Sequence, residues 1–223
     1  MASGNVKRLS IDCQATVHSG AYARGGLTRG DHQASDHDRG CQEKYVPCGI
    51  VDEESAELTI TFGSSYKTSD CIVDALAAKW AALDEHAKAA TSLLHINMDN
   101  GPESSGRRTQ FLYRMVQLAD DLHKPIQRLY SPPYHSKYHP IERCWGLLEL
   151  KGNGTKLIDA ETMVEWAKRM PWKGLAPVVA LSHKGYQKGI ALGKAAMQAV
   201  EKRLERHPAL PKYAIVINPA PTS

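Results

Sequence analysis

The stretch LLHINMD, residues 93–99, is a mostly apolar run that predicts a buried β-strand ending on an acidic residue. An amphipathic helical pattern follows in residues 106–123, where apolar side chains recur every three or four positions. The next apolar run, IQRLY at residues 126–130, predicts another strand. Strands that alternate with helices in this way are typical of an α/β sheet.

The chain before this stretch predicts strands followed by a helix. VKRLSID at residues 6–12 predicts a first strand that ends at Asp12. Residues 44–63 predict two strands around an Asp-Glu-Glu-Ser turn, and residues 68–90 predict one helix that begins at a Ser69 cap. A three-stranded meander followed by alternating helices and strands predicts a mixed central sheet with helices on both faces.

The last third of the chain has a different pattern. Residues 159–170 and a longer basic segment at 186–207 predict helices, and the tail at 212–223 predicts a short edge strand. We therefore expect an α/β core in residues 1–150 and a mostly helical C-terminal extension, residues 151–223, packed on that core.

The composition is that of an ordinary globular protein. The 223 residues are 42% hydrophobic and 23% charged, and the formal charge of +4 is compatible with a polyanionic partner. Five cysteines without a CxxC pair predict no disulfide framework. The first residues form no apolar signal segment, and no run reaches the roughly 18 apolar residues of a membrane span, so we expect a cytoplasmic protein.

Three acidic residues stand where catalytic groups gather in α/β proteins. Asp12 and Asp99 end the first and fourth predicted strands, and Glu142 lies in the first turn of a helix predicted at residues 140–150. If the two strands are parallel neighbours, Asp12 and Asp99 come close together and Glu142 faces them. Three carboxylates suit Mg²⁺ or Mn²⁺. Two such ions about 3.5–4 Å apart can activate a nucleophile and stabilise the leaving oxygen of a phosphodiester.

Each acid also has a purely structural interpretation. Asp12 can close a strand-end turn, and Asp99 precedes an Asn-Gly turn signal. If His139 is the N-cap of the helix, Glu142 occupies the position from which a carboxylate reaches back to the cap in a capping box. Trp145, one turn after Glu142, is expected to anchor this helix in the sheet.

Two long strings, INMDNGPESSGRRTQF and YSPPYHSKYHPIERCWGLLEL, resemble the catalytic core of bacterial insertion-sequence transposases of the Rhodopirellula type, in the DDE superfamily. RLSID, EKYVPCGIVDEES, FGSSYKTSD and DAETMVEWAK are also similar to that family, so the resemblance covers essentially the whole chain. It implies a ribonuclease-H-like fold, two divalent metal ions (Mg²⁺ or Mn²⁺), and metal-dependent cleavage and transfer of DNA strands. By position, Asp12, Asp99 and Glu142 match the metal-binding catalytic triad, with Asp36 or Asp38 as alternatives for the first acid.

The chain departs from the family pattern at several positions. His139 stands where the family has Asn, Cys13-Gln14 where it has Thr-Lys, and Lys151-Gly152 where it tends to His-Trp. Family members are also longer, with an N-terminal DNA-reading region. Two functions therefore stay open: an active transposase domain, or a truncated, inactive remnant that at most binds DNA or a protein. A general nuclease of the same fold is a third possible function, with weaker support in the sequence.

Two loops are candidates for DNA contact. Arg24 and Arg29 lie in a Gly-rich loop, where they can grip phosphates or belong to a solvated hairpin tip. Tyr134, His135 and Lys137 lie just before the helix of the third acid, where they can contact a strand near the metals or form a rigid loop fixed by two prolines. The expected partners are double-stranded DNA, from the element ends and the target, and a second copy of the chain, on the bacterial nucleoid.

Overall fold

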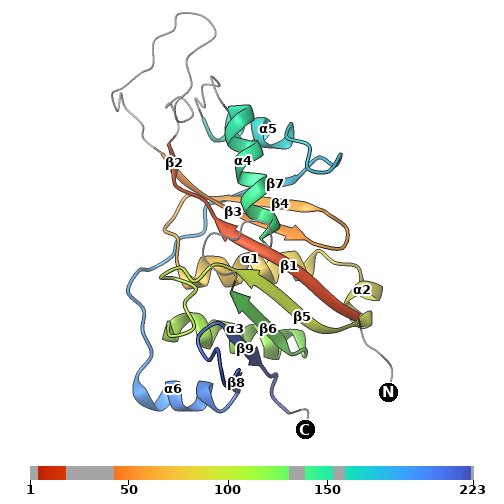
Figure 1. Cartoon of the computed structure of the whole chain (residues 1–223). Coiled ribbons are helices and arrows are strands. Elements are labelled where there is room, and N and C mark those ends of the chain that lie inside the picture. Colours follow the sequence, from red (N-terminus) through yellow and green to blue (C-terminus); the bar gives the residue numbers. More distant parts are fainter. Residues whose placement is uncertain (1–4, 19–42, 131–138, 153–158, 222–223) are drawn as a thin grey trace, which may run out of the picture.

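The computed structural model describes residues 5–18, 43–130, 139–152 and 159–221. Figure 1 shows a single twisted sheet with helices on both of its faces. The strands are β1 (Asn5–Cys13), β2 (Val17–His18), β3 (Lys44–Asp52), β4 (Leu58–Gly63), β5 (Thr91–Met98), β6 (Ile126–Tyr130), β7 (Val178–Ser182), β8 (Leu204–Arg206) and β9 (Ala214–Ile217).

The sheet has the strand order β7-β4-β3-β1-β5-β6-β9-β8, and β2 pairs with β3 outside this path. β1, β3 and β4 form an antiparallel meander, while β5 pairs in parallel with β1 and β6 in parallel with β5. A meander that leads into parallel strands with helical connections is the ribonuclease-H-like α/β arrangement, so the predicted fold class is confirmed.

The two faces of the sheet are covered by different helices. Side chains of β1 alternate between the faces because successive residues of a strand point in opposite directions. Leu9 and Ile11 join the core beneath α1 and α3, whereas Ser10 and Asp12 form hydrogen bonds with residues of α4. Figure 1 shows α1 and α3 on one side of the sheet and α4 on the other. A second apolar cluster lies between the sheet and the helices α4 and α5. The helices are α1 (Ser69–Ala81), α2 (Glu85–Ala90), α3 (Thr109–Leu122), α4 (Pro140–Gly152), α5 (Ala160–Lys168) and α6 (Lys194–Glu201).

The single helix predicted at residues 68–90 is two helices. Thr68, not Ser69, is the cap of α1, and its hydroxyl accepts a hydrogen bond from the Cys71 backbone N–H. α1 ends at Ala81, and a new helix, α2, begins after Asp84. The Asp84 carboxylate caps α2 by accepting a hydrogen bond from the Ala87 backbone N–H. The predicted cap and the predicted continuity were therefore wrong.

The chain after residue 150 is less helical than predicted. The long helix expected at residues 186–207 is limited to α6, because the preceding segment contains Gly189 with a φ of 78° and Gly193 as the helix cap. β7 was not predicted, and β9 lies between β6 and β8 rather than at the edge. Both outer strands of the sheet, β7 and β8, come from this part. The division into residues 1–150 and 151–223 stays a prediction.

Candidate active site

The register of β1 and β5 places two of the candidate acids side by side. Ser10 is the partner of Asn97 in this parallel pair. Two residues further along each strand stand Asp12, at the end of β1, and Asp99, directly after β5. Because side chains repeat every second residue, Asp12 projects from the face that carries Ser10, and Asp99 follows Asn97 at the end of the neighbouring strand. The predicted parallel pairing is confirmed, and it brings these acids to one edge of the sheet.

Helix α4 begins over the same face. The Ile141 backbone N–H donates a hydrogen bond to Ser10 Oγ over 3.4 Å, and Trp145 Nε1 donates to Asp12 Oδ2 over 3.0 Å. Glu142 precedes Trp145 by three residues, so the two side chains lie on neighbouring turns of the same helix face. The helix therefore brings Glu142 to the side of the sheet where Asp12 lies.

Gly49 permits this close approach of helix and sheet. It is the partner of Asp12 on the antiparallel strand β3. A Cβ atom at Gly49 would lie 2.6 Å from Ile141 Cδ1 and 2.7 Å from the Trp145 ring, closer than real Cβ contacts. Trp145 is 4% exposed and belongs to the second core cluster, which agrees with its expected role as the anchor of this helix.

Glu142 interacts with the residue that precedes the helix. Its backbone N–H donates to the His139 carbonyl over 3.1 Å, and its Oε1 lies 3.2 Å from His139 Nδ1. The carboxylate thus contacts the imidazole ring of the cap residue, and the side chain remains 43% exposed. His139 itself is fully buried, and its Nε2 has no hydrogen-bond partner in the part of the chain that the structure describes.

Asp99 stands at the start of a tight loop and is exposed. Ser104 Oγ donates a hydrogen bond to the Asp99 carbonyl over 3.2 Å, and the Ser104 N–H donates to the Gly101 carbonyl. Asp99 Oδ1 lies 3.3 Å from the position of a Cβ atom on Gly101, so the carboxylate points back over the turn. The loop after the acid is thereby folded onto the acid's own backbone.

The donor set fits a hard divalent cation. Asp12, Asp99 and Glu142 offer carboxylate oxygens, the ligands preferred by Mg²⁺ and Mn²⁺. Within the described residues no three His, Cys, Asp or Glu side chains are close enough together to hold a metal ion. Two of the carboxylates instead contact Trp145 and His139. Like charges repel at short range, so a bound cation is what would draw three carboxylates together.

A cation lies at the end of β1. Lys67 Nζ donates a hydrogen bond to the Cys13 carbonyl over 3.0 Å, directly after Asp12. Gln14, which replaces the lysine of the family pattern, donates instead to Glu149 of α4 over 3.0 Å. Lys67 therefore supplies positive charge at the end of β1 that the local sequence lacks, a contact that sequence reasoning missed because the two residues are distant in the chain.

The remaining predicted site residues are untested. They lie outside the described residues, and they are Arg24, Arg29, Tyr134, His135 and Lys137, together with Asp36 and Asp38 as alternative first acids.

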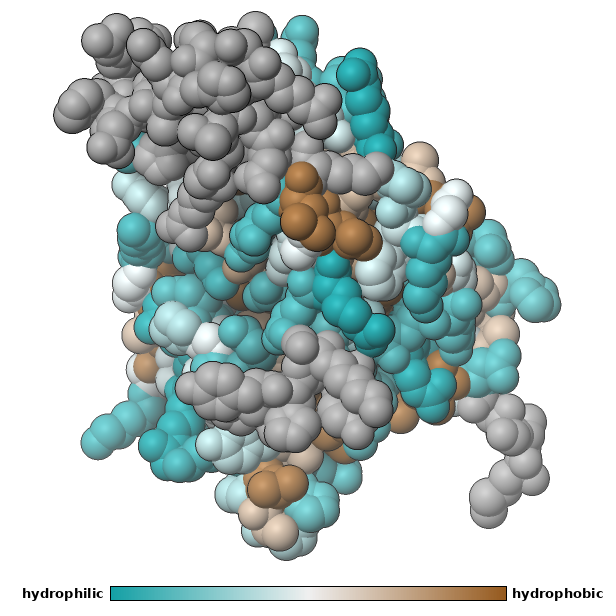
Figure 2. Space-filling view, turned by 45° about the horizontal axis from the view of Figure 1, so that its top comes forward, coloured by the Kyte–Doolittle hydropathy of each residue, from teal (hydrophilic) through white to brown (hydrophobic). Residues whose placement is uncertain are grey.

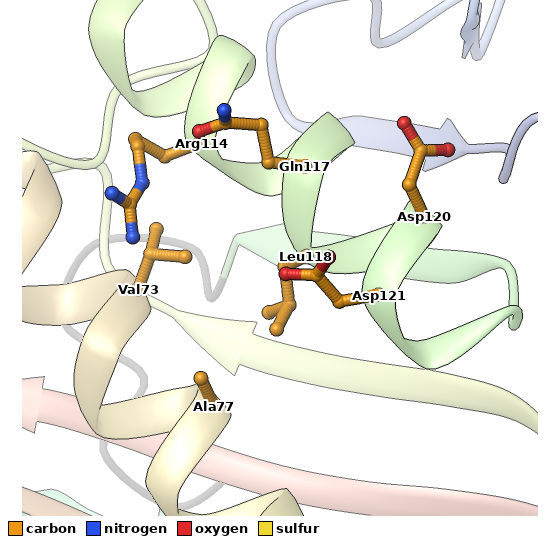
Figure 3. Close-up of a pocket in the computed structure, with 7 residues that line it drawn as sticks. All are labelled: Val73, Ala77, Arg114, Gln117, Leu118, Asp120 and Asp121. Carbon is orange, nitrogen blue, oxygen red and sulfur yellow. The ribbon is translucent and has the colours of Figure 1, made fainter.

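A cavity lies on the opposite face of the sheet. It has a volume of about 370 Å³ and opens between α1 and α3 (Figure 3). On the face of the molecule shown in Figure 2, the coloured residues are largely hydrophilic, with small apolar patches. Leu150 of α4 is 71% exposed. Because α4 and the three acids belong to the other face, this cavity is separate from the candidate site. It is lined by Val73, Ala77, Arg114, Gln117, Leu118, Asp120 and Asp121.

The sheet topology and the acids at its edge define the class of ribonuclease-H-like domains with carboxylates at the strand ends. Residues 1–219 match the family described as the Rhodopirellula transposase DDE domain, and the chain belongs to that family. The predicted family is therefore confirmed. A search of curated proteins gave no match. None of the described helices is long and apolar enough to cross a membrane.

Solved structures similar to this chain include retroviral integrases. A chain of the simian T-cell lymphotropic virus intasome, in complex with PP2A regulatory subunit B56 gamma, is 19% identical at a TM-score of 0.38; the match covers 66% of this chain and 39% of that one. The HTLV-2 integrase catalytic core domain in complex with magnesium is 14% identical in its dimeric form, with a TM-score of 0.33 and coverage of 66% and 69%. Its trimeric form is 12% identical, with a TM-score of 0.35 and coverage of 94% and 93%.

Proposed function

We propose that this chain is the catalytic domain of a DDE transposase that cuts DNA at the ends of an insertion sequence and joins those ends to target DNA. Asp12, Asp99 and Glu142 would hold two Mg²⁺ or Mn²⁺ ions. The observation that supports this most directly is the parallel pairing of β1 and β5, with Asp12 near the end of β1, Asp99 directly after β5, and the Ile141 N–H of α4 bonded to Ser10 of β1.

The chain's own residues would orient these ligands. The Trp145 N–H fixes one oxygen of Asp12, the His139 ring contacts one oxygen of Glu142, and Ser104 holds the backbone of Asp99. Hydrogen bonds of this kind set the direction in which a metal ligand presents its lone pairs. When bound, the metal ions supply an activated nucleophile and charge stabilisation for the leaving oxygen.

The reaction would proceed in two displacements. Water attacks the phosphodiester at the element end, the P–O bond breaks, and a 3′-hydroxyl is left. This hydroxyl then attacks a target phosphodiester and displaces the target's own 3′-oxygen. Lys67, beside Asp12, would attract the strand through its charge.

The proposed partners are double-stranded DNA and a second copy of the chain, assembled on DNA in the bacterial cytoplasm. Family membership and the mildly basic formal charge of +4 support a DNA substrate. Arg24, Arg29, Tyr134, His135 and Lys137 remain the proposed strand contacts.

The experiment is metal-dependent nicking of supercoiled plasmid that carries the element ends. The wild type is expected to nick with Mn²⁺ or Mg²⁺, and Asp99→Ala should reduce nicking to below about 1% because a metal ligand is lost. Glu161→Gln is the control, since Glu161 is an exposed carboxylate in the first turn of α5. DNA binding by both the wild type and Asp99→Ala, without nicking by either, would instead identify the inactive remnant.

A further inference from the structure

Arg128 of β6 is a buried cation without a carboxylate. It is 0% exposed, and burial lowers the pKa of its guanidinium to about 10. It donates to the Ser104 carbonyl and to the Lys212 carbonyl, each over 2.9 Å, and to the Tyr130 hydroxyl. Its guanidinium carbon lies 3.6 Å from the centre of the Tyr130 ring and 5.6 Å from that of Phe111. Among the described residues no acid forms an ion pair with it.

Such an arrangement is costly, because a buried charge is normally paired with an opposite charge. A strand residue in this position, facing α3, would ordinarily be apolar, as its neighbour on the same face, Ile126, is. The partners of Arg128 are instead the Tyr130 hydroxyl and the backbone carbonyls of two separate loops. This choice of partners indicates that the side chain joins those loops.

One of the joined loops carries a candidate acid. The Ser104 carbonyl accepts hydrogen bonds from both Arg128 and the Tyr130 hydroxyl. The Ser104 hydroxyl in turn donates to the Asp99 carbonyl over 3.2 Å. Ser104 is thus held on one side by the guanidinium and holds Asp99 on the other. The path from Arg128 to the backbone of Asp99 contains a single intervening residue.

Gly106 shows independently that the loop lies directly against the guanidinium. A Cβ atom at this position would collide with the Lys212 carbonyl oxygen and lie 2.9 Å from Arg128 Nη2. The loop of Asp99, the guanidinium and the C-terminal turn at Lys212 are therefore packed in one layer without spare volume.

We propose that Arg128 is a positioning residue for Asp99: through Ser104 it fixes the loop that presents this carboxylate to the metal ions. The inference rests on the proposed function for the role of Asp99, but not for the loop contacts. Tyr130 assists, because it adds a second donor to the same carbonyl. Tyr130 is also the last residue of β6, the strand that precedes Glu142 in the chain.

Amide hydrogen exchange tests the loop contacts without reference to activity. Ser104 and Arg108 each donate a backbone hydrogen bond within the loop. Arg128→Met should speed exchange of both amides by about tenfold or more, since the loop then opens locally. Tyr130→Phe keeps the ring and removes the hydroxyl, which donates to the Ser104 carbonyl and accepts from Arg128. Because the two carbonyl contacts of Arg128 remain, this variant should give a smaller effect of the same kind if Arg128→Met fails to fold. Unchanged exchange in the folded variants would overturn the proposal.

Arg203→Met is the matched control. Arg203 also joins two elements through its guanidinium, to Asp120 of α3 and the Asn218 carbonyl after β9. It makes no contact with the loop of Asp99 among the described residues. Its loss should reduce stability while exchange of Ser104 and Arg108 stays as in the wild type. Equal acceleration in this variant would mean general loosening and would refute a specific role for Arg128.

The metal requirement of nicking tests the link to Asp99. In Tyr130→Phe and Arg128→Met the Mn²⁺ concentration for half-maximal nicking should rise by about tenfold, with partial recovery at high Mn²⁺, because outer hydrogen bonds tune ligand position. A merely structural role would lower the active fraction and leave that concentration unchanged, which would overturn the proposal. Wild-type protein without nicking would refute the proposed function instead, and the exchange result would still decide on the loop contacts.

Discussion

Asp12 and Asp99 end neighbouring parallel strands, but the structure holds them by different interactions. Asp12 accepts a hydrogen bond from the Trp145 ring N–H. The Trp145 ring packs against Gly49, where α4 lies close to the sheet. Asp99 follows its strand into a loop that is held by hydrogen bonds from Ser104 and, behind it, Arg128. The first side is fixed by apolar packing of side chains. The second is fixed by polar contacts to backbone carbonyls, together with a close backbone contact at Gly106.

The difference determines which changes each side tolerates. A packed contact is sensitive to added volume, because an interior at crystal-like density has no room for another methyl group. A polar contact is sensitive to the loss of a donor, because a buried carbonyl without a partner costs about 1–3 kcal/mol. Changes on the two sides should therefore affect stability and activity in different proportions.

The largest effect is expected at the loop side from Gly106→Ala. The added methyl group collides with the Lys212 backbone carbonyl, and a backbone cannot turn aside as a side chain can. We expect the free energy of unfolding in urea to fall by about 3 kcal/mol. A loss below about 0.5 kcal/mol would show that the loop and the C-terminal turn are not packed together.

The next effect is expected at the packed side from Gly49→Ala. The new methyl group would lie within 2.7 Å of the Ile141 and Trp145 side chains, which can shift slightly. We expect a loss of about 2 kcal/mol in the same measurement. Gly146→Ala is the control on the same helix: no atom lies within 4 Å of the added Cβ, so helix propensity should stabilise the fold by about 0.5–1 kcal/mol. If the free energy of unfolding changed in the same direction in both variants, the result would contradict close packing at Gly49.

A smaller loss of stability but a clear loss of activity is expected from Trp145→Phe. The change removes the N–H donated to Asp12 and should lower plasmid nicking by about tenfold, with about 1–2 kcal/mol less stability. Trp172→Phe is the control, because Trp172 is also buried but its Nε1 has no hydrogen-bond partner in the described structure. Similar nicking by both variants would show that the hydrogen bond to Asp12 is not needed.

The smallest effect on activity is expected from Asp52→Asn. Asp52 is the last residue of β3, which runs antiparallel to β1, so it lies at the other end of the strands from Asp12. Asp52 Oδ2 lies 2.6 Å from Lys7 Nζ. Burial alone would raise the pKa of Asp52. The hydrogen bond from Lys7, the backbone N–H groups of Glu54 and Ser55, and the charge of Lys7 together outweigh burial and hold this pKa below its usual value. The ion pair therefore stabilises the fold above the unfolded carboxyl pKa of about 3.9, and this contribution is lost as pH falls through the lowered pKa.

Unfolding measured against pH checks this prediction. The variant should be less stable than the wild type by about 1–2 kcal/mol at pH 7, and the two curves should converge in acid. Nicking at pH 7 should be unchanged. A constant difference at all pH values would mean that the packing of Asp52, rather than its charge, is what stabilises the fold.

Sequence patterns predicted the parts of the fold whose signals are local. The strand β1, the turn between β3 and β4, the amphipathic face of α3 and the helix α5 were all visible in the sequence. The two wrong helix predictions also have physical causes. Residues 68–90 divide where a capping side chain outweighs a continuous helical pattern, and Gly189 limits the helix expected at 186–207.

Other features needed the tertiary structure. β7 is five residues long, and its partner β4 lies more than 100 positions earlier, so no local pattern indicates the pairing. The sequence contains only a weak indication of the role of Arg128, because Ile126, Arg128 and Tyr130 share one face of a strand. That spacing shows that an arginine points inward, but not which loops meet it.

The sequence by itself determined the family, the order of the central elements and the acids at the ends of β1 and β5, because each depends on residue types at short spacing. The tertiary structure alone decided that Ser10 pairs with Asn97, that Gly49 admits Trp145, and that a buried arginine holds the loop of Asp99. These contacts join residues far apart in the chain, and their geometry depends on strand register and close packing, which only the folded molecule specifies.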